Sequence, residues 1–301
     1  MRNRGEILAF LLHIVWWFQL PRALTMKWTP SGRSGNLEDR RSGGGLGRGL
    51  GIGGTVVVLA LSLLTGRNLF QDLGVEPGVA ANAPMTAADS AREEPQVQFV
   101  SVVLDDVQKT WSQILPKYNA QFRPAKLVLF RNSTSSGCGM AQSAMGPFYC
   151  PLDEKVYIDL GFYDELQKRF GASGDFAQAY VLAHELGHHV QHLEGIDEQV
   201  RQEQQRRPDI ANQLSVRMEL QADCFAGVWA NSTSQRQLLE EGDVNEALTA
   251  ASAVGDDRIQ QRTTGRINVD GFTHGSAAQR AQWFRRGFDS GDPKACDTFA
   301  S

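Results

Sequence analysis

Two histidines and a glutamate are spaced in this chain as metal-dependent hydrolysis requires. His184 and His188 lie four residues apart in the run 181–190, so on a helix they share one face and both imidazoles can bind one Zn²⁺. Glu185, between them, can act as the general base on a water molecule beside the metal. This HExxH pattern is short and also occurs in helices that bind no metal. Its interpretation therefore depends on a third ligand from elsewhere in the chain.

A second helical pattern supplies a candidate for that ligand. A catalytic zinc site has three protein ligands and one open position. Residues 210–231 follow Pro208 with helical spacing and contain Glu219 and Asp223, four apart on one face among apolar neighbours. The sequence predicts Glu219 as the third zinc ligand and Asp223 as the acceptor for the outer N–H of a ligating histidine. The alternative is an ordinary solvated acidic face.

Other histidines and tyrosines have less direct roles. On the helix, His189 is turned about 100° and His192 about 40° from the second ligand. We interpret His189 as a packing or surface residue and His192 as a group that could support a ligand. His274, in the turn before the last predicted helix, is our candidate donor to the oxyanion of the reaction. Tyr157 and Tyr163 are the alternatives, and His274 is otherwise a residue of a capping loop.

The elements that must position these residues begin near residue 97. Apolar spacing predicts a helix over 99–114, and the runs AKLVLF (125–130) and KVYIDL (155–160) predict strands. From residue 162 onward the pattern is almost entirely helical. We therefore expect an α+β fold, with a mainly helical metal-binding body beside a small sheet. The strand at 155–160 is either an edge to which an extended peptide substrate pairs or an ordinary core strand.

The helix that carries the HExxH pattern is expected over residues 176–194. Ser173 or Asp175 can cap its first turn, and Gly195 can end it. The two histidines would then lie well inside a regular helix, which holds their spacing fixed.

Charge is distributed unevenly along the 301 residues, although 42% hydrophobic and 21% charged residues are ordinary for a globular protein. Residues 1–70 carry a net charge of +6 and residues 71–301 a net charge of −10. The acidic body argues against a nucleic-acid partner, because a phosphate-binding surface needs clustered Lys and Arg. The basic head indicates membrane topology instead.

Residues 49–66 form an uncharged run of 18 residues, close to the roughly 20 that cross a bilayer as a helix. Basic residues are more frequent before this run than after it, so the N-terminus is expected in the cytoplasm. We predict a cytoplasmic segment 1–48, a transmembrane helix 49–66, a flexible linker 67–96 and a metal-binding domain 97–301. A buried core strand is the alternative for the apolar run.

The first 25 residues have the basic start and apolar stretch of a signal peptide but lack its cleavage site. Arg2 and Arg4 precede an apolar stretch, but no cleavage site of small residues follows. Met26 then opens a segment that has the character of a natural start. Residues 1–25 are therefore interpreted as an upstream extension from a misplaced start codon, or else as a true signal peptide.

Four cysteines all follow the apolar run, on the side where oxidising conditions permit disulfides. Four cysteines allow three pairings, and the sequence does not choose among them. We favour Cys138 with Cys150, closing a loop rich in Gly and Ser, and Cys224 with Cys296, tying the C-terminus to a helix. The alternative is two or more free buried thiols.

Several linked motifs together resemble the bacterial neutral zinc metallopeptidase family, also called YpfJ-like. The resemblance covers about residues 26–297 and includes NLEDRR before a glycine-rich stretch and one apolar run. Its most specific motifs are KVYIDLGFYDELQKRFGASGDFAQAYVLAHELGHHVQ (155–191), MELQADCFAGVWA (218–230) and THGSAAQRAQWFRRGF (273–288). The resemblance implies a membrane-anchored, zinc-dependent peptidase of gluzincin type, with one Zn²⁺ per chain, but it implies no particular substrate. By motif, His184, His188 and Glu219 match the ligands, Glu185 the catalytic glutamate and Asp223 the aspartate after the third ligand.

The expected protein is therefore a single-pass protein of a bacterial cytoplasmic membrane, with its metallopeptidase domain on the periplasmic or extracellular side. The expected reaction is hydrolysis of a peptide or protein by a zinc-activated water molecule, with Glu185 as general base and His274 at the oxyanion. One alternative is a membrane-tethered scaffold with structural zinc, although such a site needs no general base. Another is a zinc hydrolase of a different amide or ester.

Overall fold

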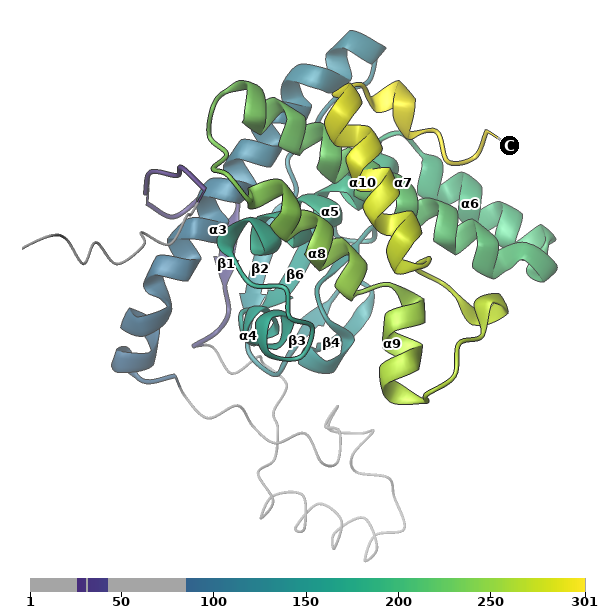
Figure 1. Ribbon diagram of the computed structural model, residues 1–301. Coiled ribbons are helices and arrows are strands. Elements are labelled where there is room, and N and C mark those ends of the chain that lie inside the picture. The colour runs from purple at the N-terminus through teal and green to yellow at the C-terminus, as the bar shows by residue number, and fades with distance from the viewer. Residues whose placement is uncertain (1–25, 31, 43–84, 301) are drawn as a thin grey trace, which may run out of the picture.

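The small sheet expected from two apolar runs has four strands in the computed structural model, which describes residues 26–30, 32–42 and 85–300 (Figure 1). The strand order is β1-β2-β6-β5. The pairs β1–β2 and β2–β6 are parallel, and β5–β6 is antiparallel. A separate hairpin is formed by β3 and β4. The bounds are β1 Leu37–Asp39, β2 Lys126–Phe130, β3 Ser133–Ser136, β4 Gly139–Gln142, β5 Phe148–Cys150 and β6 Lys155–Asp159.

The position of β6 corrects one expectation. Both strand predictions are confirmed in type and place, but β6 lies between β2 and β5, paired with β2 along its whole length and with β5 over residues 155–157. It is therefore an inner strand of the sheet and not an edge strand. Within the described residues, the edge strand beside β6 is β5, which the sequence pattern did not predict because it has only three residues.

Helices make up most of the remaining body, as predicted. Gly195, in the left-handed region at a φ of 71°, follows the helix that carries HExxH, so that helix ends where the sequence indicates. The bounds are α3 Ala87–Ile114, α4 Gly161–Lys168, α5 Asp175–Leu193, α6 Ile196–Arg206, α7 Ala211–Gln235, α8 Asp243–Ala253, α9 Asp256–Thr263 and α10 Ala277–Ser290.

The start of α5 is capped differently from the prediction. Its N-cap is Gly174, which has no side chain to accept a hydrogen bond, so neither Ser173 nor Asp175 caps the helix. Glu246 of α8 does this from a distance in sequence, accepting from the backbone N–H of Phe176 at 3.2 Å. A side chain at Gly174 would overlap the Glu246 carboxylate, and its φ of 109° also favours glycine.

Two glycines allow α7 and α10 to pack in close contact. A Cβ atom on Gly287 would lie 1.9 Å from the carbonyl oxygen of Cys224, and one on Gly227 would lie 2.1 Å from that of Phe284. Such close backbone packing is available only to glycine. It brings the polar residues of α10 against the metal-binding face of α7.

Residues 87–96, predicted as part of a flexible linker, are helical. α3 begins at Ala87, is capped by Thr86 and continues through Pro95. Proline within a helix removes one backbone hydrogen bond. The first turns are instead fixed from outside the helix, where Glu94 binds Arg33 at 2.5 Å.

Residues 26–30 and 32–42 form an N-terminal arm, purple in Figure 1, that packs on the domain. β1 of this arm is a strand of the main sheet. Arg41 has no exposed side-chain surface and binds Asp39 at 2.7 Å and Glu93 at 2.7 Å. Met26 is 2% exposed. The arm is therefore part of the same folded body as residues 85–300.

This packing bears on the predicted topology, because β1 of the arm is a strand of the domain's sheet. The placement of residues 1–48 in the cytoplasm and of the domain outside it stays a prediction. The predicted span itself lies outside the described residues. No helix that the structure describes is both long and apolar enough to cross a membrane.

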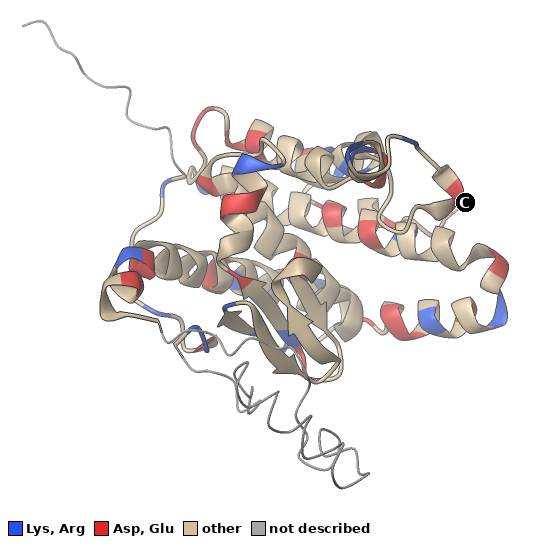
Figure 2. Ribbon diagram, turned by 90° about the horizontal axis from the view of Figure 1, so that it is seen from below, with Lys and Arg blue, Asp and Glu red and all other residues tan. Residues whose placement is uncertain are grey.

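Acidic and basic side chains are interspersed over the helices in view in Figure 2 rather than gathered by sign. Arg201 with Glu198 on α6 is an example of such a pair. Both favoured disulfides are present, Cys138–Cys150 and Cys224–Cys296.

Candidate metal centre

The structure brings the three predicted zinc ligands together. His184 and His188 lie on α5, Glu219 lies on α7, and each offers one ligand atom within 4.8 Å of the others. We call these three residues the metal centre. Nε2 of His184 is 3.2 Å from one Glu219 oxygen, and Nε2 of His188 is 3.4 Å from the other.

These separations fit zinc. With bond lengths of 2.0–2.1 Å to nitrogen and oxygen, two ligands of a tetrahedral zinc ion are about 3.3 Å apart. Each histidine nitrogen lies at about that value from one of the two Glu219 oxygens, and the three residues offer one ligand atom each within 4.8 Å of one another. Two imidazoles and one carboxylate are also the donor set of many catalytic zinc sites, which retain a fourth position for water or substrate. The residues present therefore fit a catalytic Zn²⁺ ion.

His184 is oriented by Asp223, as predicted. Its Nδ1 atom lies 2.9 Å from Oδ1 of Asp223, which is completely buried and accepts the ring N–H. This hydrogen bond directs Nε2 at Glu219 and makes it the ring atom that would bind a metal after losing its proton. Tyr180 adds a further hydrogen bond by donating its hydroxyl to the same carboxylate.

His188 is oriented by a neutral amide that our sequence interpretation did not assign. Its Nδ1 atom lies 2.8 Å from Oε1 of Gln191. The Gln191 amide nitrogen donates to Met218 O at 2.8 Å and to Gln221 at 3.0 Å, which fixes the direction of the amide. Gln191 lies three residues after His188, and this spacing on one helix face was the signal available in the sequence.

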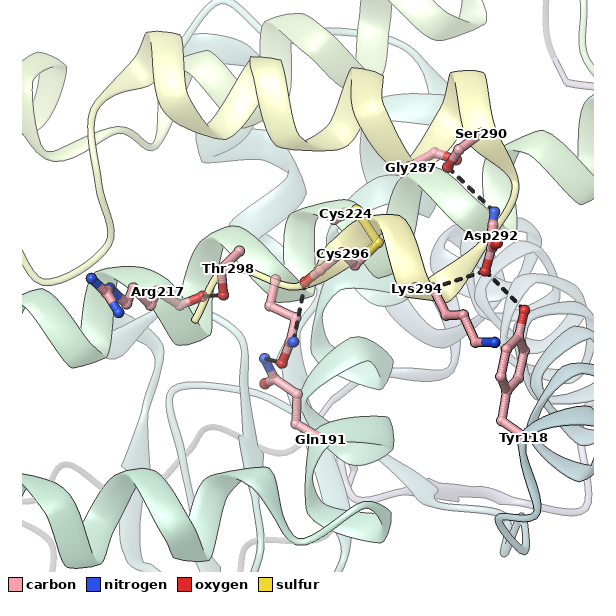
Figure 3. Close-up of a disulfide and its surroundings, with 11 residues drawn as sticks. Tyr118, Gln191, Arg217, Cys224, Gly287, Ser290, Asp292, Lys294, Cys296 and Thr298 are labelled. Atoms are coloured by element: carbon pink, nitrogen blue, oxygen red, sulfur yellow. Dashed lines mark hydrogen bonds between the residues drawn. A yellow bond between two sulfur atoms is a disulfide. The ribbon is translucent and has the colours of Figure 1, made fainter. Parts of the chain in front are cut away.

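The hydrogen bonds of Gln191, the partner of His188, continue to a disulfide, and Figure 3 shows this path from Gln191 onward. Gln221 donates to the carbonyl oxygen of Cys296 at 3.1 Å, and Cys296 is bonded to Cys224 of α7. Thr298 donates to the carbonyl oxygen of Arg217 and holds the end of the chain against α7. The C-terminal segment is thereby part of the support of the second histidine.

Arg280 is a second residue of the site that the sequence interpretation missed. It lies on α10, is 4% exposed, and binds Asp223 through Nε at 2.8 Å and Nη2 at 3.0 Å. Nη2 is also 3.5 Å from Nε2 of His184. Nothing in its local sequence distinguishes Arg280 from the neighbouring arginines of α10. The close packing of α7 and α10 brings it to the metal centre.

Glu185 is 7% exposed, and it lines a cleft of about 630 Å³ together with the metal centre. Burial raises the pKa of its carboxyl group, although the two ligating histidines oppose that rise. A raised pKa favours a group that exchanges protons during a reaction.

In the absence of a metal ion, the positive charge of the protonated histidines complements the negative charge of the Glu219 and Asp223 carboxylates. Burial opposes protonation of His184, but Asp223 and Glu219 outweigh it and raise the pKa of its imidazole to about 10. Burial likewise opposes ionisation of Glu219, but the two histidines hold its pKa well below the usual range. A metal cation would take the place of these protons, since ligands bind metals in their deprotonated forms.

The three candidates for the oxyanion position are placed differently. His274 lines the cleft, with Nδ1 at 3.2 Å from Oδ1 of Asp256, and this hydrogen bond raises the pKa of its imidazole. Tyr157 is absent from the cleft and donates to Asp153. The buried hydroxyl of Tyr163 has no partner among the described residues, and it does not line the cleft.

The two remaining histidines of α5 do not reach the metal centre. His189 is fully buried between Tyr149 and the backbone of Arg123, as expected of a packing residue. His192 binds Asp197 at 2.7 Å, so the support that we considered for it is provided by Gln191 instead.

Known proteins share this sequence over most of its length. Residues 26–299 match the family described as "Putative neutral zinc metallopeptidase". The Escherichia coli (strain K12) protein YpfJ is 48% identical over 286 residues, covering 91% of this chain and 99% of YpfJ. The Mycobacterium bovis protein Mb2605 is 46% identical over 238 residues, covering 75% of this chain and 78% of Mb2605. Both are named as uncharacterized, and no solved structure matches the chain. The chain belongs to the neutral zinc metallopeptidase family.

Proposed function

We propose that this protein is a zinc-dependent metallopeptidase that hydrolyses peptide bonds, with His184, His188 and Glu219 as the zinc ligands. The observation that carries the proposal is the arrangement of two oriented imidazoles and a carboxylate at tetrahedral separations beside the buried Glu185. A bound zinc ion supplies Lewis acidity to a substrate carbonyl and lowers the pKa of a water molecule.

Glu185 is the proposed general base. Its carboxylate would accept a proton from the attacking water and return it to the leaving amine. Burial raises the pKa of this group, which favours the protonated form needed for the second step.

Arg280 and His274 are proposed to act at two different places. Arg280 is a positioning residue, because its bidentate ion pair holds Asp223 and, through it, the ring of His184. His274 has an imidazole that Asp256 favours in the charged form, and it lines the cleft. A cationic donor there would stabilise the developing oxyanion of the substrate.

The cleft favours an extended peptide. Its lining includes Phe148 and Tyr149 of β5 together with Phe162, Phe170 and other apolar residues. β5 pairs only with β6 among the described strands, so its other side can add a substrate strand by backbone hydrogen bonding. Apolar walls would then bind hydrophobic side chains of that strand.

The alternative of a scaffold with structural zinc is less well supported. A structural zinc site is closed by four protein ligands. At this site, only three of the described side chains could bind a metal: His184, His188 and Glu219. All three line a cleft that Glu185 also lines.

We also propose that the domain works in an oxidising compartment outside the cytoplasm. All four cysteines are paired in two disulfides, a pattern rare in reducing compartments. Because the N-terminal arm is part of the domain, we expect the arm in that compartment as well.

The test of the function is the substitution Glu185→Gln. We expect kcat for peptide hydrolysis to fall by about 10²–10⁴-fold, because the general base is lost while the shape is kept. Zinc content, measured by atomic emission, should stay at one ion per chain. The matched control is Glu198→Gln on α6, an exposed carboxylate that pairs with Arg201. Unchanged activity in Glu185→Gln would refute the mechanism.

A further inference from the structure

Three carboxylates meet at the start of the metal-binding helix, roughly 13 Å along its axis from His184. Asp175 is the first residue of α5, and Asp243 and Glu246 lie in the first turn of α8, which packs beside α5 (Figure 1). One oxygen of each carboxylate lies within 4.8 Å of the others. We call these three residues the acidic cluster.

The acidic cluster has more negative charge and more acceptors than its described surroundings satisfy. Asp243 is 1% exposed, and its Oδ1 atom has no hydrogen-bond partner among the described residues. The same is true of the buried Oδ2 atom of Asp175. Burial and the two neighbouring carboxylates raise the pKa of Glu246 to about 7. The cluster therefore concentrates three acidic groups around two buried oxygens that have no described donor.

The described donors that reach the cluster are backbone N–H groups. Glu240 donates to Asp243 at 2.8 Å, and Phe176 donates to Glu246 at 3.2 Å. The third donor is the backbone nitrogen of Met26, which lies 3.2 Å from Oδ1 of Asp175.

Met26 is held firmly at this position. Its side chain is 2% exposed and belongs to the main hydrophobic core. Lys27 donates its backbone N–H to Leu238 O at 2.8 Å, and the ring of Trp28 packs edge-on against Phe99 at 5.3 Å. These contacts fix the nitrogen of Met26 at the edge of the acidic cluster.

We propose that the working chain begins at Met26 and that the acidic cluster binds its α-ammonium group. A peptide nitrogen has one N–H and no charge, whereas an α-amino group is mostly protonated at pH 7 and donates three hydrogen bonds. The ammonium would supply donors to Asp175 and Asp243 and a positive charge to three adjacent carboxylates. A bound α-ammonium group would account for both the three adjacent carboxylates and the two buried oxygens that have no described donor.

A bound divalent cation explains the same cluster less well. Ca²⁺ takes six to eight oxygen ligands. Each carboxylate here already accepts a backbone N–H, and the nitrogen of Met26 occupies one side of Asp175. An ammonium group needs only one acceptor for each of its three N–H bonds, so it does not need the six to eight oxygen ligands that Ca²⁺ takes.

The ammonium would connect the arm to the catalytic helix. Asp175 belongs both to the acidic cluster and to α5, which carries His184. A cation alone is unfavourable at a helix N-terminus, because the helix dipole is positive there. The three carboxylates between the ammonium and the helix remove that conflict and fix the first turn of α5.

The first experiment compares a chain that begins at Met26 with the same chain preceded by Gly-Ser, which converts the α-amino group to an amide. Both are released from a cleavable fusion in the same detergent, and intact mass verifies each N-terminus. We expect the chain with the free amine to have a Tm higher by about 3 °C or more, because it retains a partly buried charge pair.

Glu246→Gln in both chains separates a charge effect from a packing effect. The substitution should lower the Tm of the chain with the free amine, and it should leave unchanged or raise the Tm of the Gly-Ser chain, where it relieves repulsion. Glu241→Gln, an exposed carboxylate nearby, is the control and should change neither Tm. Equal effects of Glu246→Gln in both chains would overturn the proposal.

Two further results would decide against it. If CaCl₂ or MgCl₂ raises the Tm of both chains equally and Glu246→Gln removes that effect, the cluster is a metal site. If the intact mass of the protein from its own cells shows an N-terminus other than Met26, the assigned ligand is wrong. A native N-terminus at Met26 is the expected result.

Discussion

Two groups of three potential ligands lie on or against the same helix, yet their surroundings differ. In the metal centre, each imidazole has its outer nitrogen bound to an acceptor, so its inner nitrogen is directed at Glu219. In the acidic cluster, the ligand atoms belong to carboxylates that accept backbone N–H groups, and two oxygens lack a described partner. The number and closeness of ligands are alike. The orientation of their neighbours is what separates the proposed zinc site from the proposed site for an ammonium group.

The largest contrast should come from removing one carboxylate of each group. Glu219→Gln should lower zinc affinity by more than the 10–100-fold, roughly, that removal of a supporting group costs. Glu246→Gln should leave zinc affinity unchanged. Competition with a chelator measures both. Comparable losses in the two variants would show that the acidic cluster takes part in zinc binding.

A smaller but still large effect is expected from Asp223→Asn. Loss of the charged acceptor of His184 should lower zinc affinity about 10–100-fold. Arg280 would also remain buried without its anion, which costs about 3–5 kcal/mol in the free energy of unfolding. Titration with zinc and chemical denaturation measure the two effects. Asp209→Asn removes an exposed partner of Arg207 and is the matched control, with no change expected in either quantity.

The two ligating histidines offer a finer comparison within the metal centre. Gln191→Leu removes the neutral acceptor of His188, and we expect a loss in zinc affinity of about 10-fold, near the lower end of the range for supporting groups. Gln235→Leu on the exposed end of α7 is the control. A greater loss for Gln191→Leu than for Asp223→Asn would contradict our ranking of the charged acceptor above the neutral one.

The smallest effect concerns stability and pH. With an amide at Met26, Glu246 has a pKa of about 7 when folded against an ordinary value of 4.5, so the folded state binds more protons between these values. The contribution of Glu246 to stability should therefore be fully present below about pH 4.5 and should be lost as the pH rises towards 7. The neighbouring Asp175 and Asp243 are shifted in the same direction.

Thermal unfolding of the Gly-Ser chain from pH 4.5 to 7 measures this slope, at roughly 2–4 °C in Tm for each kcal/mol. Glu246→Gln should flatten it, whereas the exposed Glu241→Gln should not. An unchanged slope in Glu246→Gln would assign the pH dependence to other groups.

The sequence by itself predicted which three residues lie together in the metal centre, the helix that carries two of them and the α+β class. These features depend on local periodicity, because residues four apart share a helix face whatever the rest of the chain does. The same logic placed Glu219 and Asp223 correctly relative to each other. Both favoured disulfides were also right, although the sequence alone left three pairings open.

Only the tertiary structure decided which distant residues support those ligands. Arg280 reaches Asp223 because glycines let α7 and α10 approach, and Glu246 caps α5 because Gly174 leaves room for it. The packing of the N-terminal arm against the domain was likewise not predicted, since strand pairing between segments far apart has no local signature. The periodicity of a sequence indicates which face of a helix or strand is buried. Only the tertiary packing decides which residues of other elements contact that face.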